Sequence, residues 1–170
     1  MKIKKRKMKK SKGFTLSELL MVTAIIAILA TIVLYSVSAA RKKTKTTRAQ
    51  ADLEQMEISI EMLESDTAQH PGHSPVNPCI RAVASVEMDL CQAGMKCSDG
   101  SFPNWKGPYF KNEPVDPWGS KYIFDSNYQC NGQSGCQNRP VGTSVRAIVS
   151  LGENKNFDRG GDDIARVICE

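Results

Sequence analysis

The chain carries one long apolar segment, and the rest of its sequence is mixed. Leu19–Val37 is an uninterrupted run without a charge, although 24% of the whole chain is charged. As a helix, such a run rises roughly 28 Å, about the thickness of the hydrocarbon core of a bilayer. The pattern predicts a membrane-spanning segment, residues 14–38, attached to a soluble part.

A second pattern follows the span. Apolar positions recur at alternating spacings of four and three residues, with acidic residues between them, and this places them on one face of a helix. No proline occurs between Phe14 and His70. The sequence therefore predicts one helix of about 50 residues, whose residues 39–70 pack on a soluble head. A coiled coil or an ordinary core helix would show the same stripe, which consists of Ala49, Leu53, Met56, Ile60, Leu63 and Thr67.

The segment from His70 to Pro75 contains two prolines and a glycine, which end the helix. Its two histidines, His70 and His73, have no further ligand pattern around them, so we interpret them as solvated loop residues. Alternating apolar residues predict a strand at 144–151, two further strands are predicted at 121–124 and 164–169, and a short helix is predicted near residues 80–90. The predicted fold class is α+β: a long N-terminal helix packed on a small antiparallel β-sheet with disulfide-linked loops, the head spanning residues 71–170.

All of the cysteines follow the span. Their spacing contains no C-x-x-C and does not match the usual zinc sites. Disulfides suit an oxidising periplasm, so three disulfides are predicted. Six cysteines allow fifteen pairings, of which Cys130–Cys136 is the simplest; the six are Cys79, Cys91, Cys97, Cys130, Cys136 and Cys169.

Basic residues lie on both sides of the span. Residues 1–13 carry eight cations and no acid, and the rest of the chain has 15 basic against 18 acidic residues. Five further cations lie within residues 41–48. Clusters that flank an apolar span fit membrane topology better than nucleic-acid binding, and the larger N-terminal cluster favours a cytoplasmic N-terminus.

Three interpretations of the span compete. It could be a signal peptide cleaved near Val37–Ala39, although signal peptides usually have shorter apolar regions. It could be a plain signal anchor. Neither explains Glu18, which lies at the start of the run, where a carboxylate is costly unless it has a partner or a function.

The residues around Glu18 resemble a known processing site. The stretch Lys12-Gly13-Phe14-Thr15-Leu16-Ser17-Glu18-Leu19-Leu20 is similar to that of the type IV pilin-like superfamily. The resemblance implies that a prepilin peptidase removes residues 1–13 as a basic leader by cutting between Gly13 and Phe14, and methylates Phe14. It also implies that Glu18 neutralises the amino terminus of a neighbouring subunit. The alternative is that Glu18 reaches out to the lipid headgroups. Many relatives carry a kinking proline near Tyr35, and this chain does not.

A second stretch narrows the resemblance. Gly107-Pro108-Tyr109, followed by Asp116-Pro117-Trp118-Gly119 and Tyr122, resembles the signature of the major pseudopilins of type II secretion. From the residues alone, prolines and glycines set turns while aromatics cover one face of a small sheet. We therefore interpret this stretch as structural.

The loop between the last two predicted strands is rich in oxygen donors and glycines, as calcium sites require, but it lacks the spacing of an EF-hand. It resembles the calcium loop of major pseudopilins. By position, the resemblance implies Ca²⁺ ligands at the carbonyl of Leu151 and the side chains of Asn154, Asp162 and Asp163, with Asp158 as a further candidate. Relatives usually have aspartate where Asn154 stands.

The resemblance also implies a function. The chain is expected to be a single-pass inner-membrane protein with a periplasmic head, extracted into a homopolymeric fibre that drives type II secretion. The expected partners are the minor pseudopilins, the prepilin peptidase and the inner-membrane assembly platform, with no nucleic acid and no small-molecule substrate. Catalytic motifs are absent from the sequence, so no enzyme is expected. The alternatives are a type IV pilus subunit and, from a different class, a membrane-tethered periplasmic enzyme.

Overall fold

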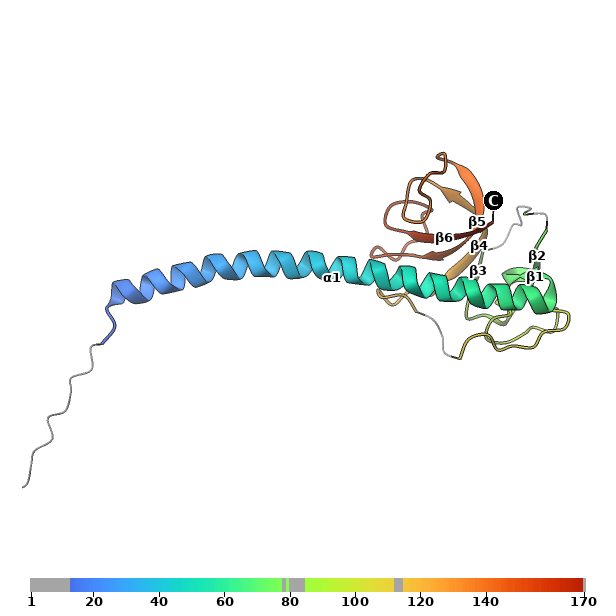
Figure 1. Cartoon of the computed structure of the whole chain (residues 1–170), viewed down its shortest axis with the longest axis horizontal. Helices are drawn as coiled ribbons and strands as arrows, with labels where there is room; N and C mark the ends of the chain where they lie inside the picture. The colour runs from blue at the N-terminus through green and yellow to red at the C-terminus, as the bar shows by residue number, and fades with distance from the viewer. Residues whose placement is uncertain (1–12, 78, 80–84, 112–114, 170) are drawn as a thin grey trace, which may run out of the picture. The chain divides into compact units, whose positions relative to one another are not determined.

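A computed structural model describes residues 13–77, 79, 85–111 and 115–169. The chain divides into two units, Met1–Arg41 and Lys42–Glu170. One helix, α1 (Leu16–Thr67), contributes to both (Figure 1). Its 52 residues confirm the prediction of a single long helix. The predicted basic leader lies outside the described residues except for Gly13.

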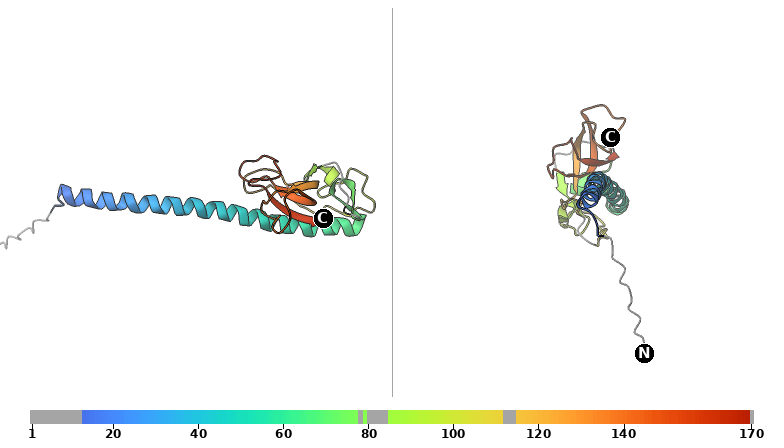
Figure 2. Two further views of the ribbon diagram at one scale, coloured as in Figure 1. Left: turned by 90° about the horizontal axis from the view of Figure 1, so that it is seen from above. Right: turned by 90° about the vertical axis from the view of Figure 1, so that its left-hand side faces the viewer.

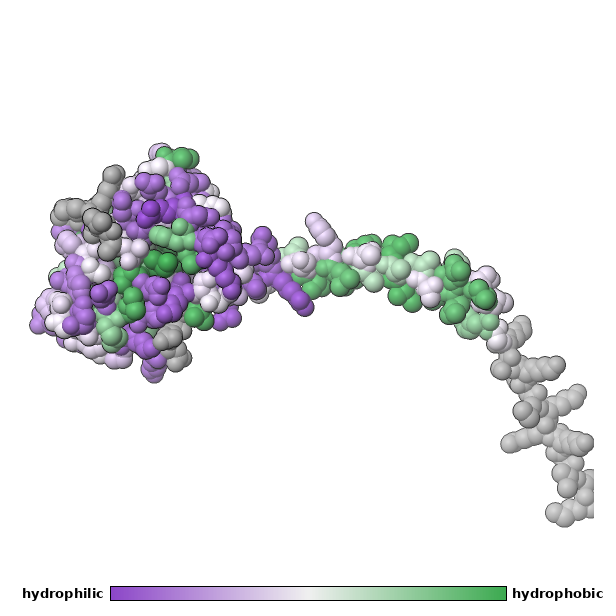
Figure 3. All heavy atoms as spheres, turned by 180° about the vertical axis from the view of Figure 1, so that it is seen from behind, coloured by the Kyte–Doolittle hydropathy of each residue, from purple (hydrophilic) through white to green (hydrophobic). Residues whose placement is uncertain are grey.

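The first unit consists, where it is described, mainly of the apolar part of α1. Its large side chains are exposed on all sides; Leu20, Ile28 and Leu34 are 64%, 62% and 70% exposed. Figure 3 shows apolar surface along this segment. By length and composition the helix is able to cross a membrane, so the apolar run has the properties that a bilayer span requires.

In the second unit, α1 packs on the head through the predicted stripe. The buried residues of the helix are those with the alternating spacings of four and three, and no others. Leu53, Ile60 and Leu63 are no more than 1% exposed. The acidic residues between them keep at least part of their surface in water. This confirms that residues of the expected amphipathic pattern bind the helix to the head, and they are Ala49, Leu53, Met56, Ile60, Leu63 and Thr67.

The head contains a four-stranded antiparallel sheet in the order β3-β4-β5-β6. The strands are β3 (Ser85–Glu87), β4 (Ile123–Cys130), β5 (Thr143–Ser150) and β6 (Ile164–Cys169). Pairing between β4 and β5 shifts between Asp125 and Tyr128, where the ladder is irregular. The predicted antiparallel sheet is confirmed, and the last two strands lie where they were predicted.

The sheet has two apolar faces. One packs on the stripe of α1 and includes Phe124 and Ile148, with Tyr122, just before β4, in the same cluster. The other holds Tyr128, Cys130 and Val145 under the loops that connect the strands. Figure 2 shows, end-on, that the sheet and the loops after α1 lie to one side of the helix. The helix and sheet therefore share one core, and one flank of the helix stays uncovered.

The segment between α1 and β4 differs from prediction. Residues 80–84 of the expected short helix lie outside the described residues, and residues 85–87 are strand β3 rather than helix. A two-stranded ladder of β1 (Gln69–His70) and β2 (Ser74–Pro75) flanks a 3-10 turn, Pro71–His73. A second 3-10 turn is Cys91–Ala93. Pairing with β4, which is remote in sequence, decides the conformation of β3, and a local pattern does not contain that information.

All six cysteines form disulfides, as predicted. Cys130 pairs with Cys136 and Cys91 with Cys97, each across a separation of 6 residues. Cys79 pairs with Cys169 across 90 residues and so ties the end of β6 to the segment after β2. The Cys130–Cys136 pairing is confirmed, and the other two resolve the fifteen arrangements that the sequence left open.

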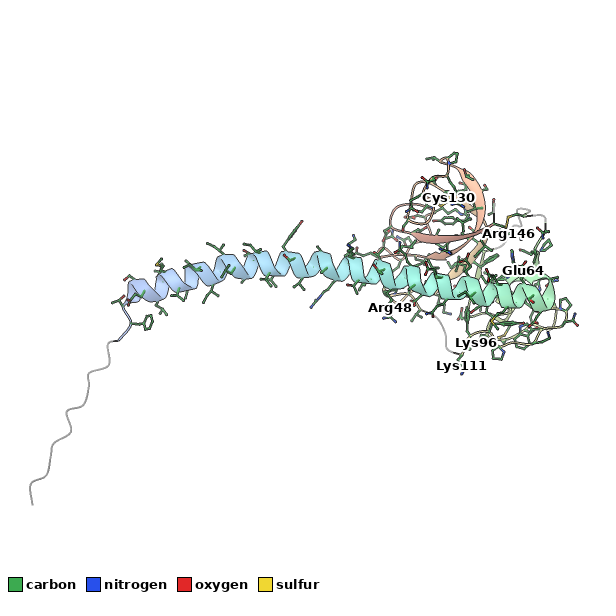
Figure 4. All side chains as sticks on the ribbon, in the orientation of Figure 1. Arg48, Glu64, Lys96, Lys111, Cys130 and Arg146 are labelled. Atoms are coloured by element: carbon green, nitrogen blue, oxygen red, sulfur yellow. A yellow bond between two sulfur atoms is a disulfide. The ribbon has the colours of Figure 1, made fainter. Side chains whose placement is uncertain are left out.

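His70 is buried, so its interpretation as a solvated loop residue is wrong. Only 2% of it is exposed. Arg146 of β5 donates a hydrogen bond to its Nδ1 over 3.0 Å, while Glu64 of α1 lies 3.5 Å from its Nε2 (Figure 4). The ring meets Phe124 edge-on. His73 remains partly exposed and its Nε2 lies 2.8 Å from Asp99.

The environment of His70 predicts a pH-dependent stability. Burial, and then the charge of Arg146, lower the pKa of His70. Protonating Nδ1 would also remove the acceptor that Arg146 uses. The pKa of His70 is lower in the folded chain than in the unfolded chain, where it is about 6.5. Its contribution to stability is therefore present above about pH 6.5 and is lost as the pH falls through the folded-state pKa.

We therefore expect His70→Asn to make the fall in stability between pH 7 and pH 5 shallower, by up to about 1.4 kcal/mol per pH unit. Urea denaturation of the full-length chain in detergent at a series of pH values measures this slope. His73→Asn is the matched control. Equal slopes for wild type and His70→Asn would show that His70 does not cause the loss of stability at low pH.

Candidate processing, assembly and calcium sites

The residues at the expected cleavage point are accessible. Nothing lies within 4 Å of the position that a side chain at Gly13 would take. Phe14 is 82% exposed and precedes the first turn of α1. A peptidase could therefore reach the Gly13–Phe14 bond without unfolding any described part of the chain.

Glu18 lies in the first turn of α1 and has a local partner. Its carboxylate accepts hydrogen bonds from the backbone N–H of Thr15 over 2.8 Å and from the Thr15 hydroxyl over 2.7 Å. The N–H of Glu18 in turn points to the Thr15 hydroxyl at 3.3 Å. This reciprocal arrangement is a capping box, which satisfies donors at the start of a helix. It gives Glu18 a structural role besides the expected assembly role.

Three of the expected calcium ligands form one hydrogen-bonded group in the loop between β5 and β6. The side-chain amide of Asn154 donates to Asp158 over 3.1 Å. The backbone N–H of Asn154 donates to Asp162 over 2.8 Å. Gly152 is also close: a Cβ there would lie 2.3 Å from the carbonyl oxygen of Asp162, at a backbone φ of +65°. The loop is folded back on itself, with its oxygen atoms gathered.

Asp163 lies beneath this group and is 1% exposed. One carboxylate oxygen accepts a hydrogen bond from the hydroxyl of Tyr128 over 3.2 Å. The other, Oδ1, is buried without a hydrogen-bond partner in the described part of the chain. Burial, and next the nearby charge of Asp158, raise the pKa of Asp163 to about 6. No cation among the described residues forms a salt bridge with this carboxylate.

These features fit a hard cation. No group of three His, Cys, Asp or Glu side chains that could hold a metal occurs among the described residues. Calcium, however, also takes backbone carbonyl and amide oxygens, which the loop offers at Leu151 and Asn154. A cation at this place would satisfy the buried oxygen of Asp163 and offset its repulsion by Asp158.

Cations that follow the span contact the head. Lys42 forms an ion pair with Glu153 of the loop between β5 and β6 at 3.0 Å. The ammonium group of Lys45 lies 5.8 Å from the ring centre of Trp118. Sequence reasoning assigned this cluster to membrane topology alone, because the loops it meets are far away in the chain.

The first part of the aromatic signature is held by Asp66, near the end of α1. Its carboxylate accepts hydrogen bonds from Lys106 over 2.7 Å and from the hydroxyl of Tyr109 over 2.9 Å. The Lys106 bond, and then that of Tyr109, lower the pKa of Asp66. The indole N–H of Trp105 donates to the carbonyl of Gly94 over 2.6 Å. The Asp66 contacts fasten the loop to the helix, and the Trp105 contact fastens it to the segment after the turn Cys91–Ala93.

The second part of the signature is organised by a buried aspartate. Asp116 is 3% exposed and accepts hydrogen bonds from the backbone N–H groups of Trp118 and Ser120, over 3.0 and 2.7 Å. Its other oxygen accepts the hydroxyl of Ser150 in β5 over 2.8 Å. Both parts of the signature thus have the structural role that was predicted from the turn residues and aromatics.

Two residues that contact the candidate sites were not predicted from the sequence, Thr15 and Tyr128. The role of Thr15 could have been predicted, since T-x-x-E before an apolar run is a capping-box pattern. That of Tyr128 could not, because its contact with Asp163 depends on how β4 and the loop between β5 and β6 approach each other across 35 residues. The candidate sites therefore have nearby residues that local spacing does not reveal.

A comparison with known protein families finds the same N-terminal motif that the sequence analysis identified. Residues 8–34 match the family model described as the prokaryotic N-terminal methylation motif. An apolar N-terminal helix that carries this motif is consistent with an inner-membrane prepilin. A solved structure, the major pseudopilin from the type 2 secretion system of enterohaemorrhagic Escherichia coli, aligns with a TM-score of 0.47 and 18% identity over 75% of this chain and 90% of that chain.

Curated relatives extend the likeness along the chain. Type II secretion system core protein G of Pseudomonas aeruginosa is 31% identical over 114 residues, which are 66% of this chain and 71% of that protein. The core protein G of Vibrio cholerae is 28% identical over 70% of this chain and 73% of its own length. The chain therefore belongs to the type II secretion core protein G family, the major pseudopilins, which are structural subunits and not enzymes.

Proposed function

We propose that the chain is cut between Gly13 and Phe14, stays in the inner membrane through residues 14–38, and is then assembled into a periplasmic fibre. The observation that carries this proposal is a methylation motif directly before an exposed apolar helix that continues into a folded head. Cleavage before the apolar segment would leave the anchor on the mature protein. Residues 39–70 and the head, residues 71–170, would then lie in the periplasm.

The chain's own residues supply the assembly chemistry that we propose. After cleavage, Phe14 bears a free amino group, which is largely cationic at neutral pH. Both this group and Glu18 are costly in a fibre core of low polarity unless they meet. Pairing of Glu18 with the amino terminus of a neighbouring copy would set the axial position, while the apolar helices supply most of the attraction.

In this proposal the fibre drives type II secretion. Extraction from the membrane requires the inner-membrane assembly platform, minor pseudopilins would share the fibre, and the prepilin peptidase acts first. Family membership supports these partners.

Deletion of the gene, followed by complementation, tests the proposal. We expect the deletion strain to retain exoproteins in the periplasm and the wild-type chain to restore their release. Unchanged secretion together with the loss of surface fibres or twitching would favour a type IV pilus subunit instead.

We also propose that the loop between β5 and β6 binds Ca²⁺. Asn154, Asp158, Asp162, Asp163 and the carbonyl of Leu151 would hold the ion. The support is the buried, unpartnered Oδ1 of Asp163 beside another carboxylate. The ion would supply positive charge to this group and fasten the loop onto β5 and β6.

Calcium is therefore expected to raise the stability of the full-length chain in detergent. At a hundredfold excess over its dissociation constant, a ligand of the folded state contributes about 2.7 kcal/mol. Thermal unfolding with EDTA, Ca²⁺ and Mg²⁺ measures this, and Mg²⁺ is expected to do less because it prefers a rigid octahedral site. Asp163→Asn should abolish the calcium effect, whereas Asp99→Asn, outside the loop, should keep it. An equal calcium shift in both variants would place the ion elsewhere.

A further inference from the structure

Five basic residues follow the apolar run of α1 within residues 41–48, and we call them the collar. The positive-inside rule disfavours basic residues on the side of the membrane to which a chain is translocated. In the proposed topology the collar lies on that side, so its charges need partners there. The collar consists of Arg41, Lys42, Lys43, Lys45 and Arg48.

Contacts within the chain account for part of the collar. Lys42 and Lys45 contact the head, and Arg48 forms an ion pair one turn further along α1. Arg41 and Lys43 are exposed and form no ion pair or side-chain hydrogen bond with any residue that the structure describes. The two cations nearest to the span on opposite sides of Lys42 are therefore open to a partner from outside the chain.

The height of Arg41 and Lys43 along the helix matches the headgroup layer of a bilayer. A hydrocarbon core about 30 Å thick takes up about 20 helical residues, here residues 19–38, and the headgroup layer adds about 5–7 Å on each side. Arg41 and Lys43 lie about 4.5 and 7.5 Å beyond the end of that core. Side chains on a helix tilt toward its N-terminus, here toward the core, so both charged groups reach the layer. Lys45 and Arg48 lie beyond it.

Cations at this height face lipid phosphates. Anionic phospholipids such as phosphatidylglycerol carry a phosphate without the amine that neutralises it in phosphatidylcholine. Each basic residue near an anionic membrane surface strengthens association about fivefold. Arg41 and Lys43 are about 200° apart around the helix, so each meets a different headgroup. Charge complementarity therefore favours anionic lipid at two places around the helix.

We propose that Arg41 and Lys43 bind the phosphates of anionic phospholipids in the leaflet from which the head emerges. Lys42, between them in sequence, pairs with Glu153 at 3.0 Å and so holds the loop between β5 and β6 beside the same headgroups. That this leaflet is the periplasmic one rests on the proposed function, whereas the binding of anionic lipid rests on the span and the collar. Extraction into a fibre then breaks these phosphate contacts in every copy.

Quenching by brominated lipids tests the binding at this end of the span. In the full-length chain, Ser38→Trp places an indole three residues before Arg41, and the chain without this substitution corrects for the native Trp105 and Trp118. Phosphatidylcholine vesicles contain a minor share of brominated phosphatidylglycerol or, in a parallel series, of brominated phosphatidylcholine. We expect phosphatidylglycerol to be enriched about fivefold around the introduced indole. The basic leader precedes the span, so its cations act on the opposite leaflet.

Removing the two charges should remove the enrichment. In the Ser38→Trp chain, Arg41→Gln combined with Lys43→Gln is expected to bring the ratio of phosphatidylglycerol to phosphatidylcholine around the indole close to that of the vesicle. Glutamine is as good a helix former as lysine or arginine, so α1 persists. The matched control is Lys96→Gln with Lys111→Gln, which removes the same charge from the loops after α1 (Figure 4) and should leave the enrichment unchanged.

Three results would overturn the proposal. They are enrichment that persists without Arg41 and Lys43, an equal loss of enrichment in the control, and the absence of any enrichment in the Ser38→Trp chain. Displacement of phosphatidylglycerol by inorganic phosphate at constant ionic strength would also contradict it, because the site would then bind the free anion. Exoprotein release by the complemented deletion strain tests the fibre and not the collar, so failure of either proposal is distinguishable from failure of the other.

Discussion

Replacing Glu18 with glutamine is expected to abolish fibre assembly while leaving the first turn of α1 intact. Glutamine can replace glutamate in a capping box, so the contacts with Thr15 would persist. The negative charge would not. An amino terminus left unpaired in an apolar fibre core costs about 3–5 kcal/mol per subunit contact, more than a hundredfold in the association constant. Fibres in sheared fractions and exoprotein release measure the effect.

The matched control is Thr15→Ala. It removes the capping hydroxyl at a cost of about 1 kcal/mol but keeps the carboxylate. Assembly should survive this change. If Glu18→Gln assembled normally and Thr15→Ala did not, Glu18 would act only as a helix cap. If both variants assembled normally, Glu18 would have no role in assembly, and its carboxylate would reach the lipid headgroups instead.

Removal of the Cys79–Cys169 disulfide is expected to cause the largest loss of stability among the three disulfides. It joins residues 90 apart, and the entropy of closing so long a loop corresponds to about 4–5 kcal/mol. A single domain is usually stable by only about 5–15 kcal/mol. The doubly substituted Cys79→Ser, Cys169→Ser chain should therefore be partly unfolded or readily degraded in the periplasm.

The Cys91–Cys97 pair is the control, because the same chemical change opens a loop with a separation of only 6 residues. Its removal should cost about 2 kcal/mol. Urea denaturation of the full-length chains in detergent compares the variants. Equal losses, or a smaller loss for the long loop, would show that chain entropy does not govern the contribution of these disulfides.

The long helix could be predicted because its information is local. The stripe from Ala49 to Thr67 repeats with the helical period, and the next proline, Pro71, lies beyond its end. Strand β5 could be predicted for the same reason, because Val145, Ala147 and Val149 alternate along it. By contrast, β3 has only three residues and depends on pairing with β4.

Burial of His70 was unpredictable for a related reason. The residue adjoins Pro71 and Gly72, which are typical of exposed loops. What buries it are Phe124 and Arg146, which arrive from the sheet. The sequence of a loop predicts its own turns, but it does not predict which distant residues pack over it.

The candidate sites divide along the same line. Gly13, Phe14 and Glu18 belong to one continuous motif, and the oxygen donors of the calcium loop all lie between Leu151 and Asp163. Both are predictions from spacing and resemblance. By contrast, three contacts join distant segments, and only the folded chain brings them together. They are the hydroxyl of Tyr128 on Asp163, the ion pair of Lys42 with Glu153 and the pairing of Cys79 with Cys169.

The measurement that tests the central proposal most directly is the intact mass and N-terminal sequence of the protein purified from its native membrane. The account predicts a chain that begins with N-methylated Phe14 and lacks the basic leader, Met1 to Gly13. A chain that begins at Ala40, or still at Met1, would contradict processing by a prepilin peptidase and, with it, the proposed route into the fibre.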